Sequence, residues 1–265
     1  LEIQSQEFQR LGVLGDWENP YTTMKFEAEA TIASELGKFL MNGSLYRGSK
    51  PVMWSPVEKT ALAEAEVEYS DHTSVTIFAR FAIASCPIDV LAGASLIIWT
   101  TTPWTMPGNR AMAFGSDIAY SALKVTSVSE GSLAIPGEVI CLADELRIDV
   151  FSACGILEAD IVHEFKGADL EGTIARHPLS HEGYNHDVLV LAADYVTTEQ
   201  GTGFVHIAPG HGPEDYDLAH LKHGVEVPDT VDEAGFIMAH LPLFGGMHVL
   251  RDNKKIADIL VQEGS

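Results

Sequence analysis

Short segments rich in β-branched and aromatic residues recur along the chain, and they constrain its fold more than any other feature. They occupy residues 74–83, 95–99, 111–125 and 187–196, and each has the composition of a β-strand. Residues 64–69 alternate glutamate with Ala, Val and Tyr, as in a half-buried strand. Many strands with few helices predict the α+β class: a predominantly β core, closed or nearly closed into a barrel, with peripheral helices.

Helical spacing of apolar residues predicts the peripheral helices. They cover residues 22–41, 142–154 and 213–223, and a last one begins at Asn253 as its cap. In the first of them, Thr22 and Thr23 are candidate caps and Asn42-Gly43 ends the helix.

Charge and cysteine content limit the partners and the compartment. The net charge is −22, with 16 basic residues that form no obvious patch, which argues against a protein that grips a nucleic-acid backbone. Three dispersed cysteines without a CxxC pair fit a reducing, cytoplasmic compartment. No apolar run approaches the roughly 18 residues that a membrane span needs. The chain starts without Met, and we expect it to be a fragment of a longer protein.

The first segment that could carry chemistry is rich in hydroxyl groups. It runs from Trp99 to Asn109, follows the apolar strand 95–99, and contains four threonines and two prolines. Threonine hydroxyls both donate and accept hydrogen bonds, so they can hold a polar substrate or a water. The same threonines could instead satisfy only their own turn, and composition alone favours that plainer interpretation.

The second segment is a Gly/Pro turn between a strand and a helix, from Gly201 to Tyr216. The strand ends at His206 and Ile207, and Pro213 suits the first position of the helix. Asp215 then falls in the first helical turn, where a carboxylate is favoured by the helix dipole. It could serve only the helix, with His206 a core residue, or it could bind an ammonium group in a cleft.

A metal site deserves comparison because five potential ligands lie within 18 residues: His206, His211, Asp215, His220 and His223. No HExxH or CxxC motif accompanies them, and we therefore expect no metal. A GxSxG elbow and a cysteine in a catalytic setting are missing too, which disfavours a serine or cysteine nucleophile.

Together the two segments resemble the editing (CP1-type) insertion of class I aminoacyl-tRNA synthetases for isoleucine, valine and leucine. Relatives for valine or leucine have Arg where this chain has Thr102, so the pattern is most similar to the isoleucyl-tRNA synthetase branch. The stretches 14–21, 50–54 and 61–69 also resemble the flanks of that insertion. Ser55 departs from the cysteine of many bacterial relatives, and we expect no effect on editing.

The resemblance implies a domain division and a set of partners. It places a helical flanking segment at 1–43, the editing domain at 44–250 and a flanking helix at 251–265. The ATP-binding motifs of the family are missing, so ATP and magnesium would serve only a synthetic domain outside this chain. The implied partners are the 3′ end of tRNA(Ile) carrying valine and the rest of the synthetase, with the fragment itself monomeric.

The resemblance also implies a role for each residue. Asp215 binds the α-ammonium of the misattached valine, and the threonines fix the ester and a water. Trp104 and His206 shape the space for the side chain and terminal adenosine, and Asn109 supports the threonine loop. The expected site uses no cofactor, and its members are Thr100, Thr101, Thr102, Trp104, Thr105, Asn109, His206, Gly210, His211 and Asp215.

Three alternatives stay open. The chain could bind the tRNA end without catalysis, although the intact threonines and Asp215 argue against this. It could edit for a valine or leucine enzyme, which Thr102 disfavours. It could be an unrelated metal hydrolase, which a metal assay would detect.

Overall fold

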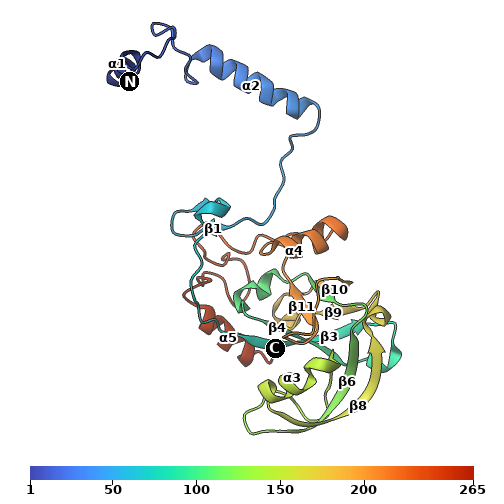
Figure 1. The fold of residues 1–265 in the computed structure, drawn as a ribbon. Coiled ribbons are helices and arrows are strands. Elements are labelled where there is room, and N and C mark those ends of the chain that lie inside the picture. Colours follow the sequence, from blue (N-terminus) through green and yellow to red (C-terminus); the bar gives the residue numbers. More distant parts are fainter. The chain divides into compact units, whose positions relative to one another are not determined.

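The computed structural model describes all 265 residues and divides them into two compact units, Leu1–Ser49 and Lys50–Ser265. The first unit consists of helices α1 (Glu2–Arg10) and α2 (Phe26–Met41), and none of its side chains is buried. The second unit contains the whole hydrophobic core and all the strands, several of which are labelled in Figure 1. The three-part division at residues 43 and 250 stays a prediction.

Nine strands of the second unit form one mixed sheet. They are β3 (Ile77–Ser85), β4 (Ser95–Thr100), β5 (Ala111–Phe114), β6 (Ala119–Val128), β7 (Val139–Ala143), β8 (Ile156–Lys166), β9 (Ile174–Arg176), β10 (Asp187–Ala192) and β11 (Phe204–Ile207). A separate two-stranded pair joins β1 (Trp54–Ser55) to β2 (Thr60–Ala61).

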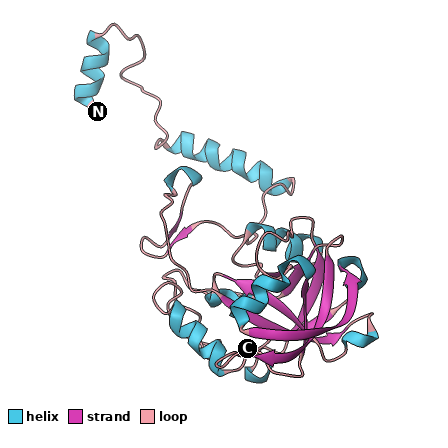
Figure 2. Cartoon of the chain, turned by 60° about the horizontal axis from the view of Figure 1, so that its bottom comes forward, coloured by secondary structure: helices cyan, strands magenta, loops and turns pink.

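Six of these strands close into a barrel. Their order is β11-β5-β10-β9-β3-β4, and β11 returns to pair with β4. That last contact is parallel and consists of a single pair, Val205 with Trp99, so it forms the thinnest seam of the barrel. Strands β7, β6 and β8 extend the sheet beyond β4. Figure 2 shows the strands, in magenta, gathered into one curved body. The predominantly β, barrel-like α+β fold expected from the sequence is therefore confirmed.

Inward-facing side chains fill the barrel and explain why the short apolar segments form it. Phe81, Leu96, Ile98, Met112 and Phe114 are at most 1% exposed and belong to one core cluster. Burying each large side chain contributes about 1.5–3 kcal/mol, so the core holds the closed sheet together.

Helices and helical turns surround the sheet. They are η1 (Glu64–Glu66), η2 (Asp89–Leu91), η3 (Pro103–Gly108), η4 (Asp144–Leu146), α3 (Arg147–Cys154), η5 (Gly167–Leu170), η6 (Ser180–Glu182), α4 (Pro213–Asp215), the π-helix η7 (Tyr216–Lys222) and α5 (Asn253–Gln262). Helix α5 contributes Ile256 and Leu260 to the core cluster of the barrel. Its cap position is Asp252 rather than the expected Asn253.

Two sequence-based expectations on local structure are wrong at residues 64–69 and 22–25. The alternating glutamates form the turn η1 rather than a strand, because Glu66 accepts a hydrogen bond of 2.8 Å from the backbone N–H of Ala63. Helix α2 begins at Phe26. The carbonyl of Thr22 accepts the N–H of Lys25 in a preceding turn, so neither Thr22 nor Thr23 is the cap.

Two further boundaries differ from expectation. Residues 111–125 contain two strands rather than one, because a turn at Gly115 separates β5 from β6, with the N–H of Ile118 bonded to the Gly115 carbonyl. Leu142 lies in strand β7, paired with Ser121, and regular α-helix starts only at Arg147. A buried leucine suits a strand as well as a helix, so the apolar spacing that starts at Leu142 could not distinguish the two.

Candidate functional site

A pocket of about 340 Å³ lies along the β4–β11 seam. Because the two strands run parallel there, the threonine segment after β4 and the Gly/Pro turn after β11 leave the barrel in the same direction. The pocket is lined by Trp99, Thr100, Thr101, Thr102, Thr105, Tyr195, Thr197, Gln200, Gly201, Thr202, Gly203, Phe204, Val205, His206, Ala208, His211 and Asp215. The seam thus brings together segments more than a hundred residues apart.

The threonine loop folds back on itself through its own hydroxyls. Thr100 Oγ1 accepts the backbone N–H of Thr102 at 3.1 Å and lies 3.2 Å from the Thr102 hydroxyl. Thr105 Oγ1 donates to the Thr102 carbonyl at 2.8 Å, within the helical turn η3. Thr101 is exposed and has no hydrogen bond through its side chain. Its hydroxyl is therefore free for a ligand, whereas the other three are partly engaged.

His206 joins the threonine loop to strand β11. Its Nε2 lies 2.9 Å from Thr105 Oγ1, and its Nδ1 lies 2.8 Å from Nδ2 of Asn109. Burial, with a smaller contribution from His211, lowers the pKa of His206 to about 3. The imidazole is therefore neutral at physiological pH, and both ring nitrogens already have partners.

Asp215 points into the pocket from the first turn of α4. Its Oδ2 accepts the backbone N–H of Ala208 at 2.8 Å, which leaves Oδ1 without a donor from the protein. Burial raises the pKa of Asp215 to about 6, opposed by the Ala208 hydrogen bond and assisted by Glu214. A Cβ at Gly212 would lie 3.1 Å from Asp215 Cγ, so glycine leaves the carboxylate its space.

His211 lines the same pocket, and contacts with Thr230 and Trp104 hold its ring in place. Its Nε2 lies 2.7 Å from Thr230 Oγ1, and its ring meets Trp104 edge-on with centroids 4.9 Å apart. Burial lowers the pKa of His211 to about 4. The pocket lining contains no Lys or Arg, and its histidines are neutral, so Asp215 is its one charged group at neutral pH. Such a site favours a cationic ligand group over a phosphate.

Seven of the ten predicted site residues line this one pocket: Thr100, Thr101, Thr102, Thr105, His206, His211 and Asp215. The other three stand outside the lining. Trp104 packs between His211 and the core, Asn109 is fully buried beneath His206, and Gly210 lies in the turn beside Pro228. The functional role of each residue stays a prediction.

The pocket is also lined by three residues from the β10–β11 connection that were not predicted from the sequence: Tyr195, Thr197 and Gln200. Their signal was weak, because Tyr195 sat inside a predicted strand that in the structure ends at Ala192. A cluster of polar residues directly before Gly201 was the only hint of a loop there.

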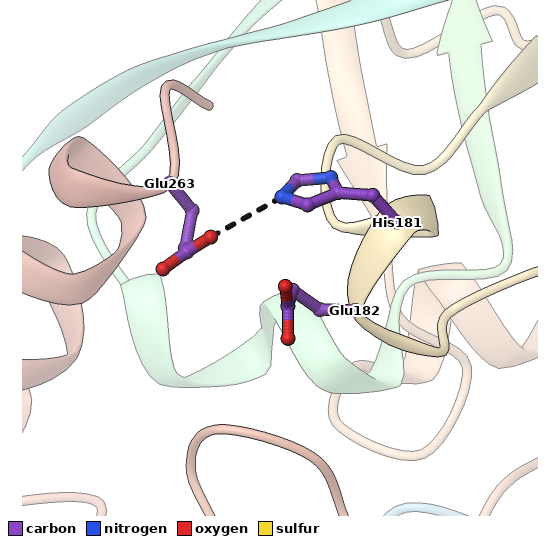
Figure 3. A group of neighbouring side chains, drawn as sticks. All are labelled: His181, Glu182 and Glu263. Atoms are coloured by element: carbon purple, nitrogen blue, oxygen red, sulfur yellow. Dashed lines mark hydrogen bonds and ion pairs between the residues drawn. The ribbon is translucent and has the colours of Figure 1, made fainter.

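The histidines considered as metal ligands do not assemble into one group. His220 Nδ1 lies 2.8 Å from the Val225 carbonyl and stands outside the pocket lining. A different set, His181, Glu182 and Glu263, brings three potential ligand atoms within 4.8 Å of one another (Figure 3). His181 Nε2 lies 3.2 Å from Glu263 Oε2, so this set joins η6 to the end of α5 as an ion pair when His181 is protonated.

None of the helices combines the length and the apolar character that crossing a membrane requires.

Residues 1–242 match the family model "tRNA synthetases class I (I, L, M and V)". The chain is 47% identical over 265 residues to isoleucine–tRNA ligase of Gluconobacter oxydans and 51% identical over 266 residues to that of Caulobacter vibrioides. The matches cover 99% and 97% of this chain but only 27% of each relative, so the chain spans about a quarter of their length.

Among solved structures, the Plasmodium knowlesi cytosolic leucyl-tRNA synthetase editing domain aligns with a TM-score of 0.49 and 11% identity, over 72% of this chain and 95% of that one. The resemblance to the isoleucine branch, carried by the threonine loop and the glycine-rich turn, is confirmed by the curated relatives. The match over residues 1–242 shows that this chain belongs to the class I tRNA synthetases for isoleucine, leucine, methionine and valine.

Proposed function

We propose that this chain is an editing domain that hydrolyses valine from valyl-tRNA(Ile). The observation that carries the proposal is the single carboxylate, Asp215, facing the threonine hydroxyls in a pocket without Lys or Arg. The relatives join isoleucine to tRNA by name. Valine lacks one methylene, which a hydrophobic pocket distinguishes by only about 1–3 kcal/mol, a limit for which isoleucine enzymes are the established example. A second, hydrolytic site compensates for that limit.

Asp215 is suited to bind the α-ammonium of the esterified valine. Its Oδ1 has no protein donor, whereas Ala208 holds Oδ2. A bound ammonium lowers the pKa of the carboxyl from about 6, because an adjacent opposite charge favours ionisation. The ammonium would thus give Oδ1 of this partly buried carboxylate the hydrogen-bond donor that it lacks in the free protein.

Hydrolysis then requires a water held beside the ester carbonyl. The water oxygen bonds to the carbonyl carbon, the bond from that carbon to the ribose oxygen breaks, and the released ribose oxygen takes the proton that the water gives up. The products are valine and tRNA with a free terminal ribose. His206 is neutral with both nitrogens engaged, so we assign the water no protein base. The neighbouring ribose hydroxyl of the substrate assists, and positioning supplies much of the rate.

Selectivity for valine over isoleucine follows from size. The pocket must admit a valyl group and exclude the extra methylene of isoleucine by steric clash. The 3′ end of tRNA(Ile) and the rest of the synthetase are the proposed partners, and no metal or cofactor enters the reaction. The fragment is proposed to act as a monomer.

The test is deacylation of two substrates by the 265-residue chain. Valyl-tRNA(Ile) and isoleucyl-tRNA(Ile) are incubated with the protein, and the release of each amino acid is followed. Faster release of valine is expected. No release of either would indicate a binding module without catalysis, and preferential release of another amino acid would indicate the editing site of a valine or leucine enzyme; either result would reject the proposal.

A further inference from the structure

Three buried side chains form an unbroken line of hydrogen bonds at the wall of the pocket. Asn109, His206 and Thr105 are 0%, 9% and 5% exposed. Nδ2 of Asn109 lies 2.8 Å from His206 Nδ1, and His206 Nε2 lies 2.9 Å from Thr105 Oγ1. Each end of the line meets a backbone carbonyl, that of Ala111 at one end and that of Thr102 at the other.

The carbonyl at the first end fixes the orientation of the Asn109 amide. Nδ2 lies 2.9 Å from the Ala111 carbonyl and 3.4 Å from that of Ile207. With the amide reversed, Oδ1 would face two carbonyl oxygens, and two acceptors repel. The NH₂ group must therefore lie there, and its second hydrogen points at His206 Nδ1. That nitrogen can only accept, so it carries no proton.

The direction of the remaining bonds follows. A neutral imidazole with a bare Nδ1 carries its proton on Nε2, which donates to Thr105 Oγ1. The Thr105 hydroxyl must then give its own hydrogen to the Thr102 carbonyl at 2.8 Å. Burial keeps the imidazole neutral by lowering the pKa of His206 to about 3.

We propose that Asn109 is a positioning residue that locks His206 in its Nε2–H form and thereby makes the Thr105 hydroxyl an acceptor toward the pocket. His206 has no free lone pair to take a proton and no free N–H to give one. Thr105 retains one lone pair, which can receive a hydrogen of the attacking water but cannot donate to the ester. The kinetic part of this inference rests on the proposed editing function; the tautomer does not.

The first test is ¹⁵N NMR of the imidazole in the intact chain, with His206 assigned through a His206→Gln variant. We expect Nδ1 at the shift of an unprotonated nitrogen and Nε2 at that of a protonated one. Neither signal should titrate between about pH 5 and 8. A protonated Nδ1, a mixture of tautomers or a titration in that range would overturn the inference, whether or not the protein deacylates tRNA.

The second test is Asn109→Asp, because a carboxylate has nearly the same shape but only accepts. His206 should then move its proton to Nδ1, and the two ¹⁵N signals should exchange roles. We expect kcat for valyl-tRNA(Ile) deacylation to fall about three- to tenfold, as for one misdirected hydrogen bond, with KM nearly unchanged. The pKa of His206 should rise beside the new charge, so kcat should acquire a pH dependence.

The side-chain oxygens of Asn109 and Asn253 are both buried without a hydrogen-bond partner. The matched control is therefore Asn253→Asp, at the first residue of α5. It should leave kcat and the His206 signals unchanged. Thr105→Val removes only the far end of the line and should lower kcat without altering the tautomer, so the inference stays testable if Asn109→Asp misfolds. An unchanged tautomer in folded Asn109→Asp, or an unaltered kcat in Thr105→Val, would contradict it. If the parent chain shows the expected tautomer but no deacylation, the proposed function is rejected and the assignment of the tautomer stands.

Discussion

Replacing Asp215 by asparagine should make the protein more stable while it removes most of the deacylation. The folded protein holds the carboxyl at a pKa of about 6, against an ordinary value of 3.8. Each pKa unit corresponds to 1.36 kcal/mol, so burying the ionised form costs about 3 kcal/mol at pH 7.5. The neutral amide avoids that cost and can still accept the N–H of Ala208. The helix dipole returns only about 0.3–1 kcal/mol to a carboxylate, so a net gain of about 2 kcal/mol is expected.

The stabilisation expected of Asp215→Asn should depend on pH. Because the folded pKa is raised, the folded state binds the proton more tightly than the unfolded state, and Asp215 lowers stability as pH rises from about 4 to 6. The stability difference between Asp215→Asn and the parent should therefore be near zero below pH 4 and full above pH 6. Urea unfolding of both proteins at pH 4 and at pH 7.5 measures this stability difference at the two limits. At pH 7.5, about 2 kcal/mol corresponds to roughly 4–8 °C in melting temperature for a unit of this size.

Activity should move the opposite way. A charge-assisted hydrogen bond contributes roughly 1.5–3 kcal/mol, so loss of the charge should slow valyl-tRNA(Ile) deacylation about tenfold to a few hundredfold. Asp217→Asn, on the exposed side of the next helical turn, is the control and should change neither quantity much. A variant that melts lower than the parent and deacylates at the parent rate would refute the reasoning, because it would show that Asp215 serves only its helix.

The free chain should show kcat/KM for deacylation rising with pH through about 6 and then levelling, as Asp215 ionises; a flat profile from pH 5 to 8 would argue against the carboxylate. Activity should survive EDTA, and stoichiometric zinc retained after purification would contradict this. Gly203→Ala should destabilise by about 2–4 kcal/mol, since Gly203 has φ +82° and a Cβ there would lie 2.5 Å from that of Ala143; Gly131→Ala, with similar φ but open space, should cost about 1 kcal/mol by urea unfolding. Removing residues 1–49 should leave the melting temperature of the rest unchanged, because no buried side chain lies there; a large drop would show that these helices support the barrel.

The sequence predicted the strands best where they cross the core. Residues 95–99 became β4 almost unchanged, and the strand before the Gly/Pro turn ends at Ile207 as expected. A buried strand carries a dense apolar signal, and a proline at the first helical position fixes a boundary by its own geometry. Asp215 could be placed in the first turn of its helix for that reason.

The sequence pattern could not predict long-range strand pairing or local hydrogen bonds of side chains. The parallel pair of Trp99 with Val205 brings the threonine loop beside the glycine-rich turn, and the Thr105–His206 hydrogen bond joins the two. No local pattern encodes a contact across a hundred residues. The wrong prediction at residues 64–69 has a local cause instead of a long-range one. There one bond from Ala63 to Glu66 outweighs an alternating pattern that has no partner strand.

The acidity of the chain and the proposed action on RNA are compatible once the pocket is considered by itself. A Lys or Arg placed there for a phosphate would lie near Asp215 and pair with it, because the carboxylate has a free oxygen. That pair would occupy the oxygen proposed to bind the substrate ammonium. A pocket free of cations is therefore a condition for recognising the amino acid through its charge. Affinity for the tRNA body must then come from surfaces outside this pocket, and we expect the isolated chain to bind tRNA(Ile) weakly.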